Sequence, residues 1–479
     1  MKAPSTFDQT LADARLQQAV YAATGRLGEK RRNSISPETI PDFQDLRQAA
    51  HELKKHTLEN LDYYLELAES RITEHGGKVI WARDGNDVIG FLKGLIQRSG
   101  ARLLVKSKSM TTEEIHLNDH IESGAVEVVE TDLGEYIIQL ARQRPYHIVA
   151  PALHMTRYEV ADLFTEKLHI ERQEVPEQQT MIARAVLREK FLSAGIGITG
   201  ANFVAADAGA VVLVENEGNA RLTSSAPKVH VAIAGIEKLI PRLADLGVFL
   251  KLLGRSATGQ PLTVYTSILS GPRRSAELDG PEEFYVVFLD NGRSRLLADV
   301  EKRQSLYCIR CGACLNHCPV YRKIGGHNYP GAYSGPIGAI LQPQYAGILH
   351  DPWLPSASSL CGACAEVCPV KIDIPKVLLS LRAEVVEQET QKGSNRLEKL
   401  GFQLWAWLMR HPKLFEMAGA AGSGILPEGN EGFLQNGPFW LKQSPAGAWL
   451  RDRDLPRPAA ESFRQLWRKR ESGGTGNVE

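Results

Sequence analysis

The chain contains 479 residues, too many for one ordinary hydrophobic core, so two or three domains are expected. Its 43% hydrophobic and 23% charged residues are typical of a globular protein. Lysine plus arginine and aspartate plus glutamate number 56 each, which excludes a global electrostatic attraction to nucleic acid or to an anionic membrane.

The N-terminus and the hydropathy pattern predict a cytoplasmic protein. Residues 1–20 lack the apolar core of a signal peptide, so export is not expected. The most apolar long stretch, residues 402–422, is interrupted by four polar or helix-breaking residues at 410–413, so no transmembrane segment is expected. The basic run at residues 30–32 is interpreted as a solvated helix face.

The first 300 residues predict helices followed by an α/β domain. Residues 46–75 carry apolar side chains mostly three and four positions apart, which predicts one amphipathic helix, and residues 1–70 are assigned to an N-terminal helical segment. β-Rich and helical stretches then alternate, which predicts a largely parallel sheet covered on both faces. These stretches are residues 78–82, 87–100, 102–107, 126–132, 134–143 and 147–152. Glycine-punctuated strand-like runs after residue 200 extend the α/β domain over residues 71–299.

The remaining chain has two further regions. Residues 300–385 hold all the cysteines in a context rich in loops, glycine and proline. Residues 386–479 form helical segments that carry five of the seven tryptophans, namely Trp405, Trp407, Trp440, Trp449 and Trp467. Such tryptophans typically anchor a segment to its own protein or to a partner. Residues 471–479 are predicted to be a disordered tail.

The cysteine spacing predicts iron–sulfur clusters. Residues 308–319 read CIRCGACLNHCP, which matches the C-x2-C-x2-C-x3-C-P run of bacterial ferredoxins, and residues 361–369 read CGACAEVCP. A loop with a thiolate at every third residue can direct three sulfurs to three corners of one iron–sulfur cube. Structural zinc instead takes two separated C-x2-C pairs, and the chain's seven cysteines cannot complete two four-cysteine zinc sites.

In such runs the fourth cysteine ligates the neighbouring cluster. Applied to both motifs, this rule gives the first cluster four ligands, Cys308, Cys311, Cys314 and Cys368, and the second cluster three, Cys318, Cys361 and Cys364. Ser358 stands where an eighth cysteine would be.

Three explanations for the missing thiolate remain open. Ser358 or Ser359 ligates iron as an alkoxide, the second cluster is [3Fe-4S], or its fourth iron holds water, another residue or a substrate. Serine is a poor iron ligand beside thiolate, which favours an open or three-iron corner. The cofactors are therefore predicted as one [4Fe-4S] cluster with four cysteines and a second cluster that is [4Fe-4S] with three cysteines or [3Fe-4S].

Two stretches of the α/β domain resemble ligand sites. Residues 195–200, GIGITG, match G-x-G-x-x-G, but the preceding segment looks helical and the following one looks like a strand, so we reject a dinucleotide site and interpret the glycines as a helix stop and turn. Lys106 and Lys108 follow a predicted strand and precede a helix, where anions bind. A turn at residues 215–230 adds Glu215, Asn219, Arg221 and Lys228. Polar connections at a sheet edge explain both stretches equally well.

The chain resembles the lactate utilization protein B family over nearly its whole length. The residues that carry this resemblance are KSKSMTTEEI, GIGITGANF, NEGNARL, CIRCGACLNHCPVYRKIGGH, GPIGAIL and CGACAEVCPVKI, in this order. The resemblance implies an α/β domain similar to the isomerase and CoA-transferase group, a dicluster ferredoxin region and a family-specific C-terminal region. It also implies two companion proteins, a cysteine-rich subunit and a second lactate-utilization-domain protein.

The leading hypothesis is an iron–sulfur electron-transfer subunit of a complex that oxidises L-lactate to pyruvate, because no residue set for catalysis stands out. A second hypothesis is an enzyme that binds an anionic small molecule near Lys106 and Lys108, with the clusters serving its turnover. A third is a scaffold with structural clusters.

Overall fold

The computed structural model describes residues 6–122, 125–393, 396–425, 433–434, 455–456 and 461–472. Two compact units divide the chain, residues 1–387 and 388–479. Trp440, Trp449 and residues 473–479 of the predicted disordered tail lie outside the described residues.

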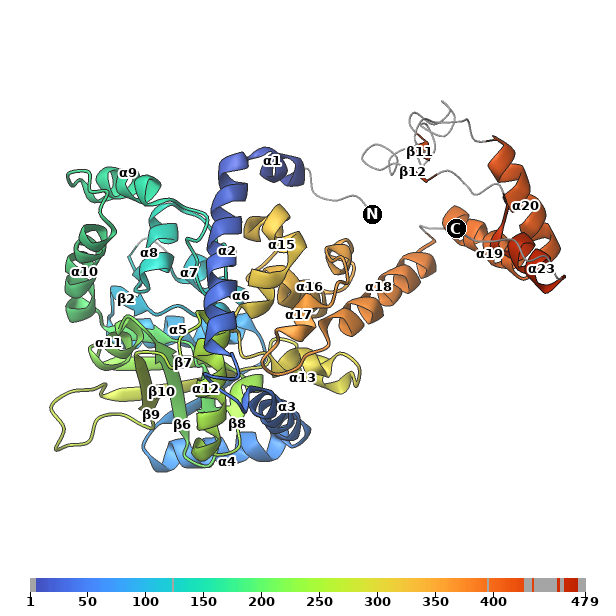
Figure 1. Ribbon diagram of the computed structural model, residues 1–479. Coiled ribbons are helices and arrows are strands. Elements are labelled where there is room, and N and C mark those ends of the chain that lie inside the picture. Colours follow the sequence, from blue (N-terminus) through green and yellow to red (C-terminus); the bar gives the residue numbers. More distant parts are fainter. Residues whose placement is uncertain are drawn as a thin grey trace. The chain divides into compact units, whose positions relative to one another are not determined.

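The N-terminal segment forms α1 (Thr6–Ala12), α2 (Ala14–Ser34), α3 (Phe43–Glu59) and α4 (Leu61–Glu74) (Figure 1). The prediction of one helix over residues 46–75 is wrong, because Asn60 has non-helical dihedral angles (φ −125°, ψ 36°) and separates α3 from α4. The Asn60 side chain donates a hydrogen bond to the carbonyl of His56 at 2.8 Å, a local bond that competes with helix continuation. The break lets α3 contact the chain just before the cysteines, while α4 packs on the strands.

A parallel sheet forms the centre of the first unit. In the described residues its strand order is β1 (Lys78–Ala82), β10 (Glu283–Leu289), β7 (Val229–Gly235), β4 (Ile196–Thr199), β2 (Leu103–Lys106) and β3 (Glu127–Glu130), and every neighbouring pair is parallel. Successive side chains alternate between faces: Val231 and Ile233 join the core under α5 (Gly85–Ser99) and α7 (Leu117–Ile121), whereas Ala232 and Ala234 join the core of α4. The predicted parallel sheet with both faces covered is confirmed.

A smaller mixed sheet packs in the same core as α4. Its order is β8 (Leu239–Ile240), β5 (Phe203–Ala205), β6 (Ala210–Glu215) and β9 (Tyr265–Leu269). The other helices of this part of the chain are α6 (Met110–Glu114), α8 (Leu133–Leu140), α9 (Arg157–Leu168), α10 (Pro176–Ser193), α11 (Asn219–Ser225), α12 (Leu246–Ala257) and α13 (Arg293–Ala298).

Two local predictions in the α/β domain are wrong. GIGITG does follow the end of α10 at Ser193, as the predicted helix stop requires, but it is not a turn: Ile196–Thr199 is β4, inside the parallel sheet. Its glycines allow close packing, because a Cβ on Gly197 would collide with the carbonyl oxygen of Thr223 in α11. Residues 147–152 are not a strand but a loop, whose backbone N–H groups at Val149 and Ala150 donate to the His147 ring.

The cysteine region of the first unit is built from short helices and loops. Its helices are α14 (Ala313–His317), α15 (Pro319–Ile324), α16 (Gly335–Ala346), α17 (Ala363–Glu366) and α18 (Ile374–Gln391). The long helix α2 packs against α14 and α15 (Figure 1). The N-terminal segment is therefore part of the support of the cysteine region.

The second unit contains α19 (Arg396–Met409), α20 (Pro412–Ile425), α23 (Phe463–Glu471) and the short strands β11 (Phe433–Leu434) and β12 (Leu455–Pro456). Glu416 of α20 pairs with Arg464 and Arg468 of α23 at 3.5 and 2.7 Å. Trp405, Trp407 and Trp467 are exposed.

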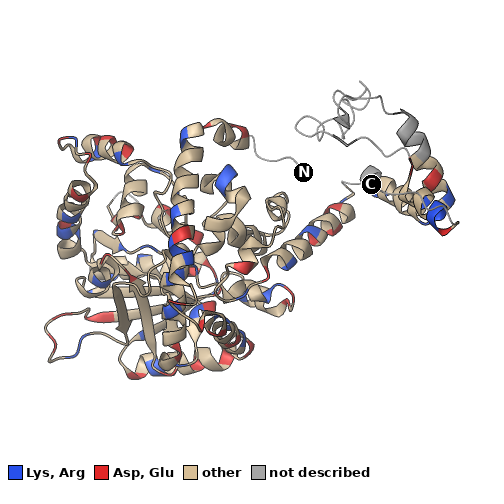
Figure 2. Cartoon of the chain, in the orientation of Figure 1, with Lys and Arg blue, Asp and Glu red and all other residues tan. Residues whose placement is uncertain are grey.

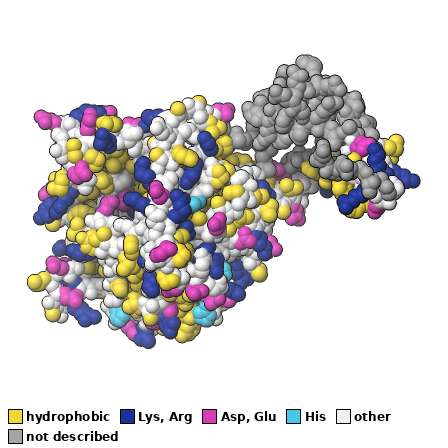
Figure 3. Space-filling view, viewed as in Figure 1, with side chains coloured by type: hydrophobic (Ala, Val, Ile, Leu, Met, Phe, Trp, Pro, Cys, Tyr) yellow, Lys and Arg dark blue, Asp and Glu magenta, His cyan; other side chains and the backbone are white. Residues whose placement is uncertain are grey.

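Charged side chains of both signs are interspersed over the first unit (Figures 2 and 3). No helix among the described residues combines the length and apolar character that a membrane crossing requires.

Candidate metal centre

The seven thiols fall into two neighbourhoods. Cys308 and Cys368 lie close enough to Cys311 to raise its pKa, after the larger effect of burial, and the pKa of Cys314 is raised by burial and then by Cys308, Cys311, Cys364 and Cys368. We call Cys308, Cys311, Cys314 and Cys368 the first thiol group. Cys318 and Cys361 likewise raise the pKa of Cys364, after burial, and these three are the second thiol group. Cys364 is also close enough to raise the pKa of Cys314, so the two groups adjoin each other.

Burial disfavours bare thiolates in most of the site. Burial is the main reason that the pKa of Cys311 and of Cys364 rises to about 12 and that of Cys368 to about 11. Cys361 differs, because it is exposed and hydrogen bonds from the Ala363 backbone and then the Ser359 side chain lower its pKa. Bound metal deprotonates coordinating thiols, so the buried cysteines suit a site whose positive charge the metal supplies.

Backbone amides point at the thiol sulfurs, as an iron–sulfur site requires. The N–H groups of Arg310, Tyr321 and Ile372 donate to the sulfurs of Cys308, Cys318 and Cys368 at 3.4, 3.4 and 3.3 Å. The loops obtain this geometry from residues in the left-handed region, such as Gly312 at φ 73° and Gly362 at φ 84°. In the described residues, no three His, Cys, Asp or Glu side chains form a group suited to a single metal ion.

Ser358 occupies the position in the second loop that Cys308 occupies in the first. The Leu360 N–H donates to Ser358 Oγ at 3.1 Å, just as the Arg310 N–H donates to Cys308 Sγ. Arg310 and Leu360 share left-handed backbone angles, φ 62° and 55°. The backbone around Ser358 thus positions the Ser358 hydroxyl as the backbone around Cys308 positions the Cys308 thiol.

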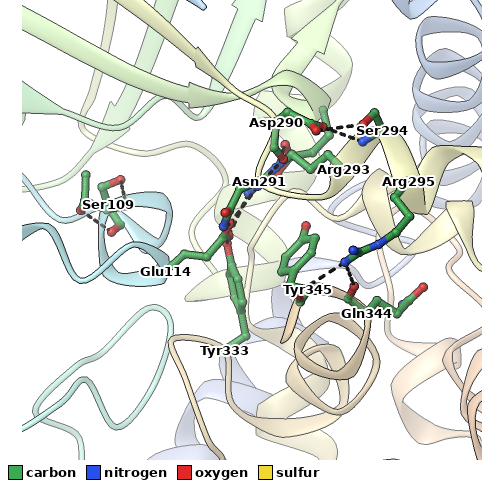
Figure 4. Close-up of polar contacts among 12 residues, drawn as sticks. Ser109, Glu114, Asp290, Asn291, Arg293, Ser294, Arg295, Tyr333, Gln344 and Tyr345 are labelled. Atoms are coloured by element: carbon green, nitrogen blue, oxygen red, sulfur yellow. Dashed lines mark hydrogen bonds and ion pairs between the residues drawn. The ribbon is translucent and has the colours of Figure 1, made fainter. Parts of the chain in front are cut away.

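A buried charge network contains Arg293 and Glu114 (Figure 4) and extends to Arg310, which lies near Cys308 of the first thiol group. Arg293 pairs with Glu114 at 2.9 Å and with Glu237 at 2.5 Å, and Arg310 pairs with Glu237 at 3.2 Å. Burial alone would raise the pKa of Glu237, but Arg293 and Arg310 outweigh it and lower that pKa to about 2. Glu114 also accepts a hydrogen bond from Tyr333 at 2.9 Å, which joins the α/β domain to the chain before α16.

The network carries excess positive charge near Cys308. Lys54 donates to the backbone carbonyl of Glu237, and burial lowers the pKa of Lys54 to about 7 and that of Lys238 to about 8. Cys308 is close enough to raise the pKa of Lys54, Lys238 and Arg310. A thiolate at Cys308 would therefore stabilise the charged form of each of these side chains. Thiolate-bound clusters are anionic overall, so these cations fit a cluster on the first thiol group.

Arginines of the N-terminal helices hold the second motif. Arg47 of α3 donates to the carbonyl of Cys368 at 2.8 and 2.9 Å and to that of Glu366 at 2.8 Å. Arg31 of α2 donates to the carbonyl of Val367 at 3.0 Å and is buried. The interpretation of residues 30–32 as a solvated face is therefore wrong for Arg31, although Lys30 and Arg32 are exposed.

Aromatic side chains exclude water from the site. Tyr321, Tyr329 and Tyr333, in the segment between the motifs, are buried. Tyr329 lies near Cys318 and Cys314, whose negative charge would raise its pKa further after burial. His147, from the loop after α8, contacts Asn316 of α14 at 3.2 Å.

The two lysines of the predicted anion site have different surroundings. Lys106 is buried and pairs with Glu130 at 2.7 Å and Glu113 at 3.0 Å, so its charge is already matched. Lys108 instead lines a cavity, together with Glu215 and Asn219. Arg221 and Lys228, also singled out from the sequence, are not among the residues that line it.

Sequence reasoning missed Arg47, Glu237, Lys238, Arg293 and Arg310. Only Arg310 had a local signal, its place inside the first motif. The others come from distant segments, and their role depends on the fold.

Comparison with known proteins identifies the class and then the family. Residues 304–372 match a 4Fe-4S dicluster domain and residues 65–289 a LUD domain, so the chain is an iron–sulfur protein with an α/β domain. Residues 380–472 match the C-terminal region of lactate utilisation protein B. The chain belongs to the lactate utilization protein B family.

Its relatives match along almost their whole length. Lactate utilization protein B of Bacillus licheniformis is 43% identical, covering 96% of this chain and 95% of the relative. The Bacillus subtilis protein of the same name is 42% identical, with 95% and 94% covered. An Escherichia coli K12 relative named as an uncharacterized electron transport protein, YkgF, is 41% identical, with 97% and 96% covered. A solved DUF162 family protein from Deinococcus radiodurans is 11% identical with a TM-score of 0.28, covering 48% of this chain and 98% of its own.

Proposed function

We propose that the chain is a cytoplasmic iron–sulfur electron-transfer protein in the oxidation of L-lactate to pyruvate and supports growth on lactate. The observation that carries this proposal is the pair of adjoining thiol groups, whose members are buried or half-buried except for the exposed Cys361. The names of the relatives supply lactate and electron transport as the context.

The first thiol group would hold a [4Fe-4S] cluster with four thiolates, and the second would hold a cluster with three. Such clusters, when bound, take up and release one electron at a time. The amides of Arg310, Tyr321 and Ile372 would stabilise the thiolates, and the buried tyrosines would keep water away. Ser358 would face the fourth position of the second group, as Cys308 would face the first, and serine, water or an empty corner would then complete the second cluster.

Companion proteins would exchange electrons with this chain. We expect a cysteine-rich subunit and a second lactate-utilization-domain protein, because the family resemblance implies them. The exposed Trp405, Trp407 and Trp467 support a docking role for residues 386–479. We also propose that residues 71–299 share the isomerase and CoA-transferase architecture, which the parallel sheet supports. Residues 1–70 would form the N-terminal helical region and residues 300–385 the dicluster region.

Electron paramagnetic resonance of anaerobically purified protein tests the proposal. Oxidised and dithionite-reduced samples should show signals of reducible clusters, and iron should match acid-labile sulfide. A signal in the oxidised sample would identify a [3Fe-4S] second cluster. Clusters that resist reduction at physiological potentials would instead support a structural scaffold, and colourless protein that contains zinc would contradict the proposal.

A further inference from the structure

A cavity of about 310 Å³ lies where the α/β domain meets the first cysteine motif. Residues that follow β2, β3, β4 and β7 line it, so it lies at the carboxyl edge of the parallel sheet. Open α/β sheets bind their ligands at this edge. Arg310 and Cys311 also line the cavity, which places it beside the first thiol group.

One side of the cavity carries incompletely paired cations. Lys238 is 7% exposed, and no hydrogen bond or ion pair joins its ammonium group to another described residue. Lys108 likewise has none among the described residues. The guanidinium of Arg310 uses Nη2 for Glu237 and lies over the Tyr333 ring at 4.6 Å, while its buried Nε and Nη1 have no hydrogen-bond partner. Buried donors without partners are costly, so a bound anion would be stabilised here.

Carboxylates line the cavity as well. Glu217 is exposed as a whole residue, while desolvation of its carboxyl group, followed by Asp132, raises its pKa and Lys108 opposes that rise. One oxygen of Glu217 accepts the Leu133 N–H at 3.2 Å. A carboxyl group accepts a hydrogen bond from a hydroxyl when it is ionised and can donate one to a carbonyl when it is protonated.

Neutralising the cluster does not explain all of these cations. Lys238 and Arg310 lie near Cys308, so they serve the first thiol group as well. Lys108 instead lies near Glu217, which also lines the cavity, and near Glu135 and His147, which do not. Its own place in the lining makes its charge available to a ligand in the cavity.

We propose that this cavity binds a small 2-hydroxy- or 2-oxo-carboxylate, with the carboxylate at Lys108, Lys238 and Arg310 and the C2 oxygen at Glu217. The choice of acid rests on the proposed function, whereas the anion site rests on the cavity and its cations. Since one water takes up about 30 Å³ of liquid, the cavity also has room for acids longer than lactate. The chain would then hold the acid itself, in addition to carrying electrons.

Calorimetric titration of anaerobically purified, iron-loaded protein with L-lactate, with pyruvate and with inorganic phosphate tests the proposal. Wild-type protein should bind at least one of the two acids saturably and more tightly than phosphate. Lys108→Gln should weaken binding at least tenfold, because it removes a cation that no other described residue pairs. The matched control is Lys228→Gln, an exposed lysine outside the cavity lining, which should bind as wild type does.

A second variant covers the case in which Lys108→Gln fails to fold. Ala201→Leu adds bulk to the cavity wall without changing a charge and should also weaken binding. Three results would overturn the proposal: no saturable binding of either acid, tighter binding of phosphate, or full binding by Lys108→Gln or Ala201→Leu. Reducible clusters in protein that binds neither acid would leave the electron-transfer role intact, and acid binding by protein with irreducible clusters would do the reverse.

Discussion

The two cysteine loops, residues 308–318 and 358–368, have similar backbone conformations but differ in their surroundings. Both place a left-handed residue and then a left-handed glycine at matching positions, and both direct an amide at the first donor atom, Cys308 Sγ or Ser358 Oγ. The first loop packs under the α/β domain beside the network of Glu237 and Arg293. The second exposes Cys361. A repeated motif therefore sets where the donor atoms lie, while the surrounding fold sets charge and access of water.

The largest expected difference between the loops is in iron content. Cys368→Ala removes a buried ligand that does not line the cavity, where water cannot easily replace it, so the first cluster should be lost and iron should fall from about eight to about four per chain. Cys361→Ala removes an exposed ligand that water can replace, and most iron should remain. Iron and sulfide assays on anaerobic protein measure both. Equal losses would contradict the difference in water access.

The second largest difference is in stability. Glu237→Gln removes a buried carboxylate that pairs with Arg293 and Arg310, and it should lower the free energy of unfolding by about 3–5 kcal/mol. Glu366→Gln, at an exposed side chain of the second loop, is the matched control and should change it by less than about 0.5 kcal/mol. Anaerobic urea denaturation gives both values. A small effect at Glu237 would show that the buried network does not stabilise the fold.

The cysteine motifs made the thiol groups predictable, because the spacing of ligands to a cluster is a local property of the chain. β2 and β3 were also predictable, since buried parallel strands form short apolar runs, and β1 was predictable from its β-rich run although it lies at the sheet edge. β4 was not, because its glycines are set by the close approach of α11 to Gly197.

Arg31 and Arg47 were equally hidden, since their partners are carbonyls more than three hundred residues away along the chain. Sequence periodicity shows which side chains lie on one face of an element. It does not show which distant element will cover that face. The charge network and the cavity therefore required the folded chain.

Lowering the pH should destabilise the packing around His147, which contacts Asn316 in the first cysteine loop. The His147 ring accepts hydrogen bonds from the N–H groups of Val149 and Ala150, and burial, followed by Lys108, lowers its pKa to about 3. Below the unfolded value of about 6.5 the unfolded chain binds a proton that the folded chain does not, so stability falls with pH. Between pH 6.5 and 5 the loss from this group should be about 2 kcal/mol. Urea denaturation of wild type and His147→Gln at both pH values measures it, and equal pH dependence would contradict this assignment.

The smallest expected effect is a change in the free energy of unfolding. It comes from a substitution that gives the second loop the same first donor residue as the first loop. Ser358→Cys places a thiol where the Leu360 N–H already holds a hydroxyl, so the free energy of unfolding should change by less than about 1 kcal/mol. The second group would then have four thiols, and both clusters should become [4Fe-4S] with similar signals after reduction. Ser358→Ala is the matched control, since it removes the oxygen and adds no ligand.

The pair of variants separates serine ligation from the other two explanations for the missing eighth thiolate. If serine ligates iron, Ser358→Ala should change the spectrum of the second cluster. If the corner is open or the cluster has three irons, Ser358→Ala should match wild type, whereas Ser358→Cys should differ from both. Identical spectra from all three proteins would show that the shared backbone of the loops does not bring residue 358 to the metal, and the likeness between the loops would then end at Leu360.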